Sequence, residues 1–223
     1  MKEFIVIPAF NEERKIGEVL NDLKSAGYNN LVVVDDGSRD KTSQIASEYN
    51  VNVIRHTINR GQGAALKTGI NFSLENGADI IVTFDSDGQH CVEEIPSLIE
   101  PIKKREVDVS LGSRFIKENS VPFVRKLFLK GGMFAIRILY GVKLTDSHNG
   151  FRALSREACQ KIDLKCDKME HASEILEQIN QKGLIYKEIP VTIKYTDYSI
   201  RHGQSTFNAF KILSKMILNK FLR

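Results

Sequence analysis

The sequence has few of the features that hold a small secreted domain together or carry a chain across a membrane. Its 223 residues include no tryptophan, 5 prolines and 3 cysteines, Cys91, Cys159 and Cys166. The cysteines form no C-x-x-C pair and have no paired histidine nearby, so we expect neither a disulfide framework nor a zinc site. No apolar run approaches the roughly 20 residues that span a bilayer, and residues 1–8 lack the features of a secretion signal. These absences predict a cytoplasmic protein whose membrane contact, if it has one, is peripheral.

The composition is that of a compact, folded chain. Hydrophobic residues make up 42% and charged residues 27% of the sequence, which is enough for a full core and argues against intrinsic disorder. The formal net charge of +4 is modest, and nucleic acid is not an expected partner. We expect a single domain over residues 1–205, and the sequence does not indicate an oligomeric state.

Residues 206–223 have the pattern of a basic amphipathic helix. Apolar side chains recur along one helical face, and lysine, arginine and asparagine side chains recur along another. From Ser199 to Arg223 the chain has five basic residues and no acidic residue, which favours an anionic partner. Such a helix can rest on anionic lipid at the cytoplasmic membrane face or pack its apolar side on the domain, and the sequence leaves both open.

Short β-branched runs alternate with helical patterns in the first half, which predicts β-α-β units and a mostly parallel sheet covered by helices. The expected strands are Glu3–Pro8, Leu31–Asp35, Val51–Arg55, Ala78–Asp85 and Val107–Gly112, and the expected helices are Glu12–Ala26, Lys41–Tyr49, Gly63–Glu75 and Val92–Lys104. After Gly112 this rhythm breaks. There we expect an irregular stretch around Phe115–Tyr140, a loop with the sequence TDSHNGFRA, two short helices and a late strand at Ile185–Tyr195.

Acidic residues follow the fourth expected strand, in the segment IIVTFDSDGQH. Ligands of open α/β sheets bind outside the carboxyl ends of the strands, where Asp85, Ser86 and Asp87 lie. On an extended segment, residues two apart point to the same side, so Asp85 and Asp87 would converge on one ion, with Gln89 continuing that side. Mg²⁺ or Mn²⁺ suits such oxygen ligands, since phosphate and water complete its shell. The alternative is an ordinary turn capped by Asp and Gly.

Two further strand ends carry polar or aromatic residues. The segment VVVDDGSRDKT ends a strand in Asp35 and Asp36 before a helix that Ser38 or Asp40 caps. Its carboxylates could accept hydrogen bonds from a base or ribose, or they could simply cap a turn. In IPAFNEE, Pro8 and Phe10 could pack against a nucleotide base, while Glu12 begins the helix.

The glycines of NRGQGAALKTG match neither common phosphate-binding motif. The third glycine of G-x-G-x-x-G is replaced by Leu66, and no G-x-x-x-x-G-K is present. We therefore expect Gly61 and Gly63 to permit a tight turn and close helix packing, with Lys67 as a candidate contact to a ligand.

Taken together, the segments IPAFNE, VVVDDGSRDKT, NRGQGAA, FDSDGQH, GSRF, DSHNGFRA and RHGQS resemble a family 2 glycosyltransferase, in the branch of dolichyl-phosphate mannose and glucose synthases. The resemblance runs from about Ile5 to Ser205. It implies a GT-A fold, which is an α/β fold with a Rossmann-like, mostly parallel sheet flanked by helices and a mixed C-terminal part on the acceptor side.

The resemblance also implies roles for particular residues. The nucleotide-sugar would be bound by Pro8, Phe10, Glu12, Asp36, Asp85, Ser86 and Asp87, with Asp36 on the base; the metal would be held by Asp85, Asp87 and Gln89; and the phosphates would be met by Arg114, Arg125 and Arg201. The match loosens at Leu129, where the family often has serine, and at Thr206, where it often has lysine.

The expected reaction is inverting transfer of a sugar from a UDP-sugar or GDP-mannose to a polyprenyl or dolichyl phosphate. Charge that develops on the leaving diphosphate calls for a Mg²⁺ or Mn²⁺ ion and arginines, so the expected catalytic residues are Asp87, Arg114 and Arg201, together with Asp146. An anionic phosphate acceptor needs no strong base. A soluble or glycan hydroxyl acceptor would need one, and Asp146 is then the candidate. A non-catalytic nucleotide-sugar-binding module is a second alternative.

Overall fold

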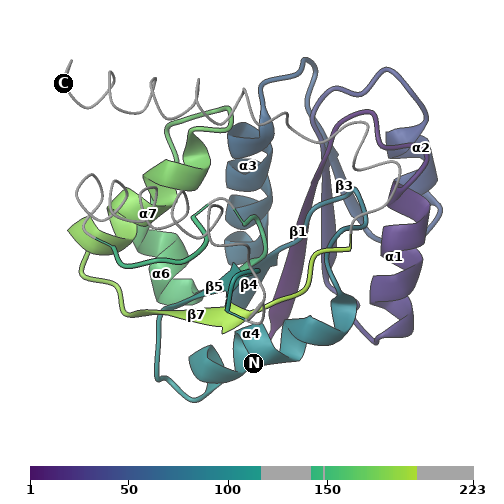
Figure 1. Ribbon diagram of the computed structural model, residues 1–223. Coiled ribbons are helices and arrows are strands. Elements are labelled where there is room, and N and C mark those ends of the chain that lie inside the picture. The colour runs from purple at the N-terminus through teal and green to yellow at the C-terminus, as the bar shows by residue number, and fades with distance from the viewer. Residues whose placement is uncertain (117–141, 148, 195–223) are drawn as a thin grey trace, which may run out of the picture.

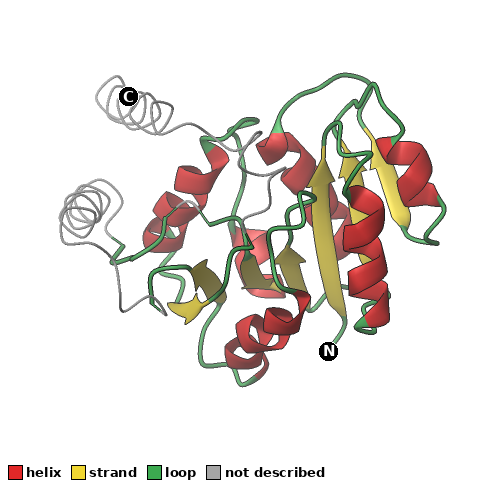
Figure 2. Ribbon diagram, turned by 45° about the vertical axis from the view of Figure 1, so that its right-hand side comes forward, coloured by secondary structure: helices red, strands yellow, loops and turns green. Residues whose placement is uncertain are grey.

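The computed structural model describes residues 1–116, 142–147 and 149–194. Within these residues the chain forms one seven-stranded sheet with helices on both faces (Figures 1 and 2). The strands are β1 (Glu3–Ala9), β2 (Leu31–Asp35), β3 (Asn52–Arg55), β4 (Ile80–Thr83), β5 (Val109–Ser113), β6 (Arg152–Ser155) and β7 (Tyr186–Pro190). The helices are α1 (Ile16–Ser25), α2 (Thr42–Ser47), α3 (Gln62–Glu75), the 3-10 turn η1 (Val92–Glu94), α4 (Ile95–Lys103), α6 (Arg156–Lys161) and α7 (His171–Gln181).

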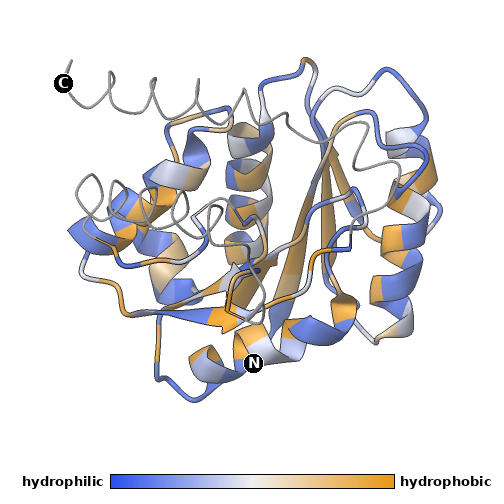
Figure 3. Ribbon diagram, viewed as in Figure 1, coloured by the Kyte–Doolittle hydropathy of each residue, from blue (hydrophilic) through white to orange (hydrophobic). Residues whose placement is uncertain are grey.

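Two apolar layers lie on the two faces of the sheet. Alternate residues of β1 point to opposite sides, so that Val6 packs with Leu66 of α3, whereas Ile7 packs with Leu20 of α1. Helices α6 and α7 join α3 on the first face, and α2 and α4 join α1 on the second. Figure 3 shows the strands as mostly hydrophobic and α1 with one hydrophobic side turned to the sheet, as its apolar spacing predicts.

The strand order is β3-β2-β1-β4-β6-β5-β7. The first four strands are mutually parallel, and β5 and β7 are parallel to each other. Strand β6 is antiparallel to both of its neighbours, β4 and β5. The predicted mostly parallel sheet with a mixed C-terminal part is therefore confirmed.

The largest error of the sequence-based prediction is β6. We expected TDSHNGFRA to be a loop throughout, but Arg152 and Ala153 begin a strand that separates β4 from β5. All four residues of β6 are buried. A buried, four-residue strand has no alternation of polar and apolar residues, so the pattern that marks a half-exposed strand is absent.

Two expected element ends also differ. Helix α1 begins at Ile16 and not at Glu12, because Asn11 has a left-handed φ of 56° and a turn follows it. The late strand ends at Pro190 and not at Tyr195. The other expected strands and helices are confirmed to within three residues of their ends, and the two short helices are α6 and α7.

The glycines before α3 permit close packing, as expected. A Cβ atom on Gly61 or Gly63 would lie 2.4 or 2.1 Å from a backbone carbonyl oxygen of the segment 163–168. The N–H of Ala64 donates to the carbonyl of Asp167 over 3.1 Å. The start of α3 is thus covered by the protein's own backbone.

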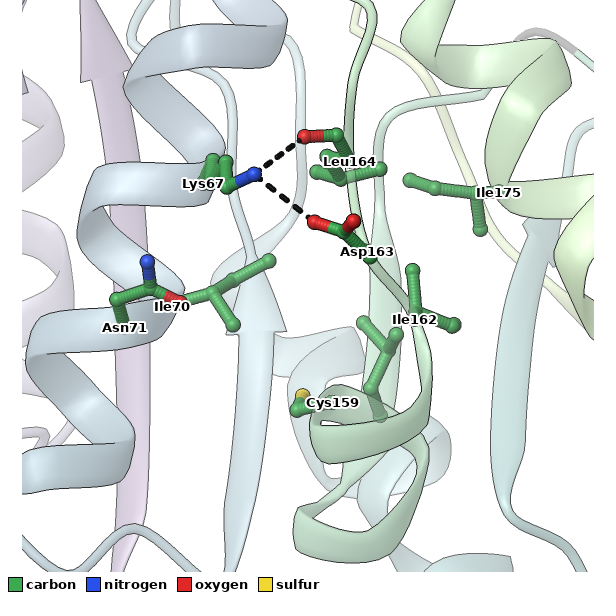
Figure 4. A pocket seen from close by; sticks show the side chains of 9 residues that line it. Lys67, Ile70, Asn71, Cys159, Ile162, Asp163, Leu164 and Ile175 are labelled. Carbon is green, nitrogen blue, oxygen red and sulfur yellow. Dashed lines mark hydrogen bonds and ion pairs between the residues drawn. The ribbon is translucent and has the colours of Figure 1, made fainter.

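Lys67 of α3 also bonds to the segment 163–168. Its Nζ lies 2.9 Å from Asp163 Oδ1 and 2.8 Å from the carbonyl of Leu164. Beneath this ion pair lies a small, largely apolar cavity of about 40 Å³ whose walls include Ile70 and Ile175 (Figure 4).

The irregular stretch expected around Phe115–Tyr140 and the expected tail helix at 206–223 lie almost wholly or wholly outside the described residues. None of the helices that the structure describes combines the length and the apolar character needed to cross a membrane.

Candidate active site

The topology brings the predicted site residues to one edge of the sheet. Strands β2, β1 and β4 are neighbours and parallel, so Asp36, Phe10 and Asp85 follow strand ends at the same edge. Strand β6 is antiparallel, and its first residue, Arg152, lies opposite both Thr83 of β4 and Leu111 of β5. The loop that precedes β6 therefore comes to this edge as well. That loop, residues 145–151, carries Asp146.

Asp85 follows β4 and is held on both carboxylate oxygens. His90 Nε2 lies 3.0 Å from Oδ2, and the Gln62 amide donates to Oδ1 over 3.1 Å. The backbone of Gly150 approaches closely, since a Cβ there would lie 2.7 Å from Asp85 Oδ2. Burial opposes ionisation of Asp85, but the hydrogen bond from His90 and the nearby His90, His171 and Arg152 side chains hold its pKa below the ordinary value. Asp85 is therefore a fixed carboxylate.

His90 orients Asp85 from within the core. Its side chain is 3% exposed, stacks on Phe151 at 4.7 Å between ring centroids, and meets Phe84 edge-on at 5.3 Å. Sequence reasoning missed this residue and Gln62. The only signal for His90 was its position directly after the acidic segment.

Asp87 lies in a turn and not on the extended segment that we expected, because β4 ends at Thr83 and Gly88 has φ of 77°. Its Oδ1 accepts from the Gln89 N–H over 3.0 Å. Burial and the neighbouring negative charge of Asp85 raise the pKa of Asp87. The two carboxylates thus repel each other at this edge.

A divalent cation would relieve that repulsion, and carboxylate oxygens are its preferred ligands. Among the described residues, no three His, Cys, Asp or Glu side chains form a complete metal site. The pair Asp85 and Asp87, with Gln89 beside it, fits an ion that takes its remaining ligands from phosphate and water, but it does not fit a closed structural site.

Asp36, the predicted base contact, is 3% exposed and accepts several hydrogen bonds from its own chain. The N–H groups of Arg60 and Gly61 donate to it over 3.0 and 2.6 Å, and His56 Nδ1 lies 2.7 Å away. Asp36 therefore holds the loop between β3 and α3 against the end of β2. This role is one that the sequence did not predict.

The segment that follows β1 is hydrogen-bonded to the segment that follows β2. The N–H groups of Asn11 and Glu12 donate to the hydroxyls of Ser38 and Thr42 over 2.9 and 2.8 Å. Neither capping candidate is the N-cap of α2, because Lys41 holds that position without a side-chain cap; Asp40 accepts from the N–H of Thr42, the first residue of α2, over 3.0 Å. Pro8 is buried.

Phe10 is 43% exposed, so its ring is accessible to a ligand at this edge of the sheet. Ser86, between the two acidic residues, is 6% exposed.

Arg114, directly after β5, forms a bidentate ion pair with Asp146. Its Nε and one terminal nitrogen lie 2.7 and 2.8 Å from the two Asp146 oxygens, and its backbone N–H donates over 3.2 Å. The Arg114 side chain is 31% exposed, whereas that of Asp146 is 2% exposed. The partly exposed guanidinium can meet an anion, while both oxygens of the buried carboxylate accept hydrogen bonds from it.

Arg152 is a buried cation that sequence reasoning missed. It is 3% exposed and donates to the backbone carbonyls of Asn149 and Ser147 over 3.0 and 3.3 Å. Burial lowers its pKa to about 10, against the opposing effect of Asp146 and Asp85. Arg152 thus fixes the loop that carries Asp146 and that approaches Asp85 through Gly150. The predicted residues Arg125 and Arg201, and the departures at Leu129 and Thr206, lie outside the described residues.

Residues 4–163 match the sequence pattern of the family described as Glycosyl transferase family 2. A UDP-N-acetylglucosamine–dolichyl-phosphate N-acetylglucosaminyltransferase of Methanococcus voltae is 34% identical in an alignment of 239 positions, gaps included, which covers 97% of this chain and 95% of that protein. A dolichol-phosphate mannosyltransferase of Pyrococcus furiosus is 36% identical over 233 residues, covering 97% of this chain and 64% of that protein.

The fold is shared with a solved structure of glucosyl-3-phosphoglycerate synthase from Mycobacterium tuberculosis, in complex with Mn²⁺, uridine diphosphate and glucosyl-3-phosphoglycerate. The TM-score is 0.74 at 19% identity, and the match covers 99% of this chain and 78% of that one. At this identity the likeness concerns the fold alone. The family match and the two relatives give the wider conclusion: this chain is a glycosyltransferase with the GT-A fold and belongs to glycosyl transferase family 2.

Proposed function

We propose that this chain transfers a sugar, with inversion, from a nucleoside-diphosphate sugar to a polyprenyl or dolichyl phosphate. The observation that carries the proposal is the placement of two carboxylates, Asp85 and Asp87, directly after β4, at the edge where β1, β2 and β4 end. The names of the two relatives support a dolichyl-phosphate acceptor. They name different sugars, so both UDP-sugars and GDP-mannose are candidate donors.

In this proposal Asp85, Asp87 and Gln89 hold a Mg²⁺ or Mn²⁺ ion, which when bound neutralises the charge that grows on the leaving diphosphate. His90 and Gln62 keep Asp85 in place, so the site needs no rearrangement when charge develops. Phe10 and Glu12 bind the nucleotide, with Pro8, Asp36 and Ser86 as further predicted contacts that lie buried beside them. The partly exposed Arg114 meets substrate phosphate, together with Arg125 and Arg201.

The state of Asp146 favours a phosphate acceptor over a hydroxyl. A hydroxyl must lose its proton to a base within hydrogen-bond reach, and both oxygens of Asp146 are engaged by Arg114. The Asp146 side chain is also only 2% exposed, so an acceptor hydroxyl cannot reach it without a rearrangement of this loop. A phosphate oxygen is already anionic and needs only to be positioned, a task that Arg114 suits.

The test is a transfer assay that pairs a panel of UDP- and GDP-sugars with polyprenyl phosphate, with and without Mg²⁺ or Mn²⁺. We expect metal-dependent transfer with one donor class, and a loss of about 100-fold or more in Asp87→Ala. Asp22→Ala, at an exposed acidic residue of α1, is the matched control and should keep full activity.

Full activity in EDTA, or in Asp87→Ala, would contradict the proposed metal site. Transfer to a glycan hydroxyl but not to polyprenyl phosphate would replace the proposed acceptor. Binding of nucleotide-sugar without transfer to either acceptor would indicate the non-catalytic alternative.

A further inference from the structure

We propose that Glu188 is a positioning residue: it holds the turn Thr145–Asp146 so that the Asp146 carboxylate keeps Arg114 aimed at substrate phosphate. The inference deepens the proposed function and rests on it, because it takes Arg114 as a residue that meets phosphate. Glu188 lies on β7, 42 residues along the chain from Asp146, and no motif in the sequence pointed to it.

The Glu188 carboxylate accepts hydrogen bonds from three donors of this turn. The Thr145 N–H donates to it over 2.8 Å, the Thr145 hydroxyl over 2.9 Å, and the Asp146 N–H over 3.1 Å. Because the Thr145 hydroxyl donates to Glu188, it accepts from the Ser113 hydroxyl, 2.6 Å away. The turn is thereby fixed both to β7 and to the end of β5.

The same turn presents Asp146 to Arg114. The Asp146 N–H donates to the Glu188 carboxylate, while the two Asp146 carboxylate oxygens accept from the Arg114 guanidinium at 2.7 and 2.8 Å. Strands β5 and β7 are parallel neighbours, with Leu111 opposite Glu188. One chain of contacts therefore runs from β7, through the turn, to the arginine that follows β5.

The contacts favour a carboxylate at position 188. An ionised carboxylate only accepts hydrogen bonds, and here it faces three donors. All three donors reach Oε1, and the Thr145 N–H also lies 3.0 Å from Oε2. A glutamine would place its NH₂ donor at the Oε2 position, facing the Thr145 N–H, and its neutral oxygen would accept the three hydrogen bonds more weakly than a carboxylate does. The charge has a cost, since burial raises the pKa of Glu188 and the adjacent Asp146 raises it further, although the three hydrogen bonds act in the opposite direction. A site that tolerates this cost is better explained by a positioning role than by simple packing.

The experiment is a double-mutant cycle with Glu188→Gln and Arg114→Ala, read as kcat and KM for polyprenyl phosphate. We expect Glu188→Gln alone to lower kcat/KM for the acceptor by about 10- to 100-fold, the usual effect of losing a residue that orients a binding group. In the Arg114→Ala background the same change should alter kcat/KM less than about twofold, because the residue that Glu188 positions is already gone. Glu106→Gln, an exposed carboxylate that pairs with Lys187 at 3.9 Å, is the matched control and should behave as wild type.

Equal losses in both backgrounds would overturn the inference, as would wild-type kinetics in Glu188→Gln. If Glu188→Gln does not fold, Glu188→Asp serves instead: it keeps the charge but shortens the reach, so we expect a smaller loss in the same parameter.

A second readout does not depend on transfer. The Arg114 Nε–H signal in a ¹H–¹⁵N spectrum, assigned by its absence in Arg114→Lys, should be shifted and slow to exchange in wild type and should lose both properties in Glu188→Gln. An unchanged signal would refute the positioning role. If the wild-type protein transfers no sugar to polyprenyl phosphate, the proposed function fails while this spectrum still decides what Glu188 does.

Discussion

At the scale of single residues, the site is built from side chains that the sequence points to and from others that orient them. Asp85 and Asp87 follow a hydrophobic strand, and the resemblance of the motifs to family 2 glycosyltransferases singles them out. His90, Gln62, Arg152 and Glu188 act on residues far away along the chain, or from within the core. Their roles depend on distances between elements, which no local pattern encodes.

One prediction at this scale concerns His90. In His90→Phe the ring still packs on Phe84 and Phe151, but the hydrogen bond to Asp85 Oδ2 is lost. We expect the affinity for Mn²⁺ with UDP or GDP, whichever the wild-type protein binds, to fall by about 10-fold or more. Isothermal titration calorimetry measures the affinity, and urea unfolding should give nearly the wild-type free energy of unfolding. Unchanged affinity would refute a positioning role for His90.

Asp146 illustrates how a residue type alone leaves a role open. Its place in a polar loop suggested a base for a hydroxyl acceptor, yet the side chain is 2% exposed and paired with Arg114. The pairing depends on β6, which brings the loop 145–151 beside the end of β5. Without that strand in the prediction, the partner of Asp146 could not be found.

At the scale of elements, the parallel half of the sheet was predicted well because β1, β2 and β4 are apolar runs bounded by turn residues. The start of α1 was placed too early because Glu12 and Glu13 look like a first helical turn, whereas the left-handed φ of Asn11 delays the helix.

The contact between α3 and the segment 163–168 gives a prediction at this scale. In Gly63→Ala the new Cβ would lie 2.1 Å from the Cys166 carbonyl oxygen, so backbone must shift. We expect a loss of about 1–3 kcal/mol in the free energy of unfolding, as for other overpacked sites, measured by urea titration. Gly17→Ala is the matched control near the start of α1: its Cβ meets only side-chain atoms, the Tyr49 hydroxyl at 3.1 Å and Ile45 Cγ2 at 3.4 Å, and no backbone. Equal stability of the two variants would contradict the close packing.

At the scale of the whole molecule, stability should depend on pH through buried histidine. His171 is 5% exposed, and burial lowers its pKa. The unfolded chain therefore binds a proton below about pH 6.5 that the folded chain resists, and the free energy of unfolding falls as the pH drops through that range. In His171→Asn, whose amide can replace the hydrogen bond from Nδ1 to the Lys168 carbonyl, the decline between pH 7.5 and 5.5 should be shallower. Urea titrations at these two pH values measure it, and identical slopes would refute the assignment.

The basic tail supports a prediction from sequence alone. Residues 206–223 lie outside the described part of the chain, so their amphipathic pattern remains a prediction. In liposome flotation with anionic lipid, the full chain should bind more strongly than a chain ending at Ser205, and added salt should weaken the difference. Equal binding by both, with the shorter chain still folded, would remove the tail from the proposed docking at the membrane.

The insertion of β6 has a consequence for how the chain is made. Ile80 of β4 pairs with Ser155 of β6, so a growing chain leaves one side of β4 without its partner until some 75 further residues have been synthesised. At ordinary rates of translation this takes roughly 4–15 s. Until then the side of β4 that β6 covers has no partner in the chain, and an unpartnered apolar strand edge is a site for pairing with other chains.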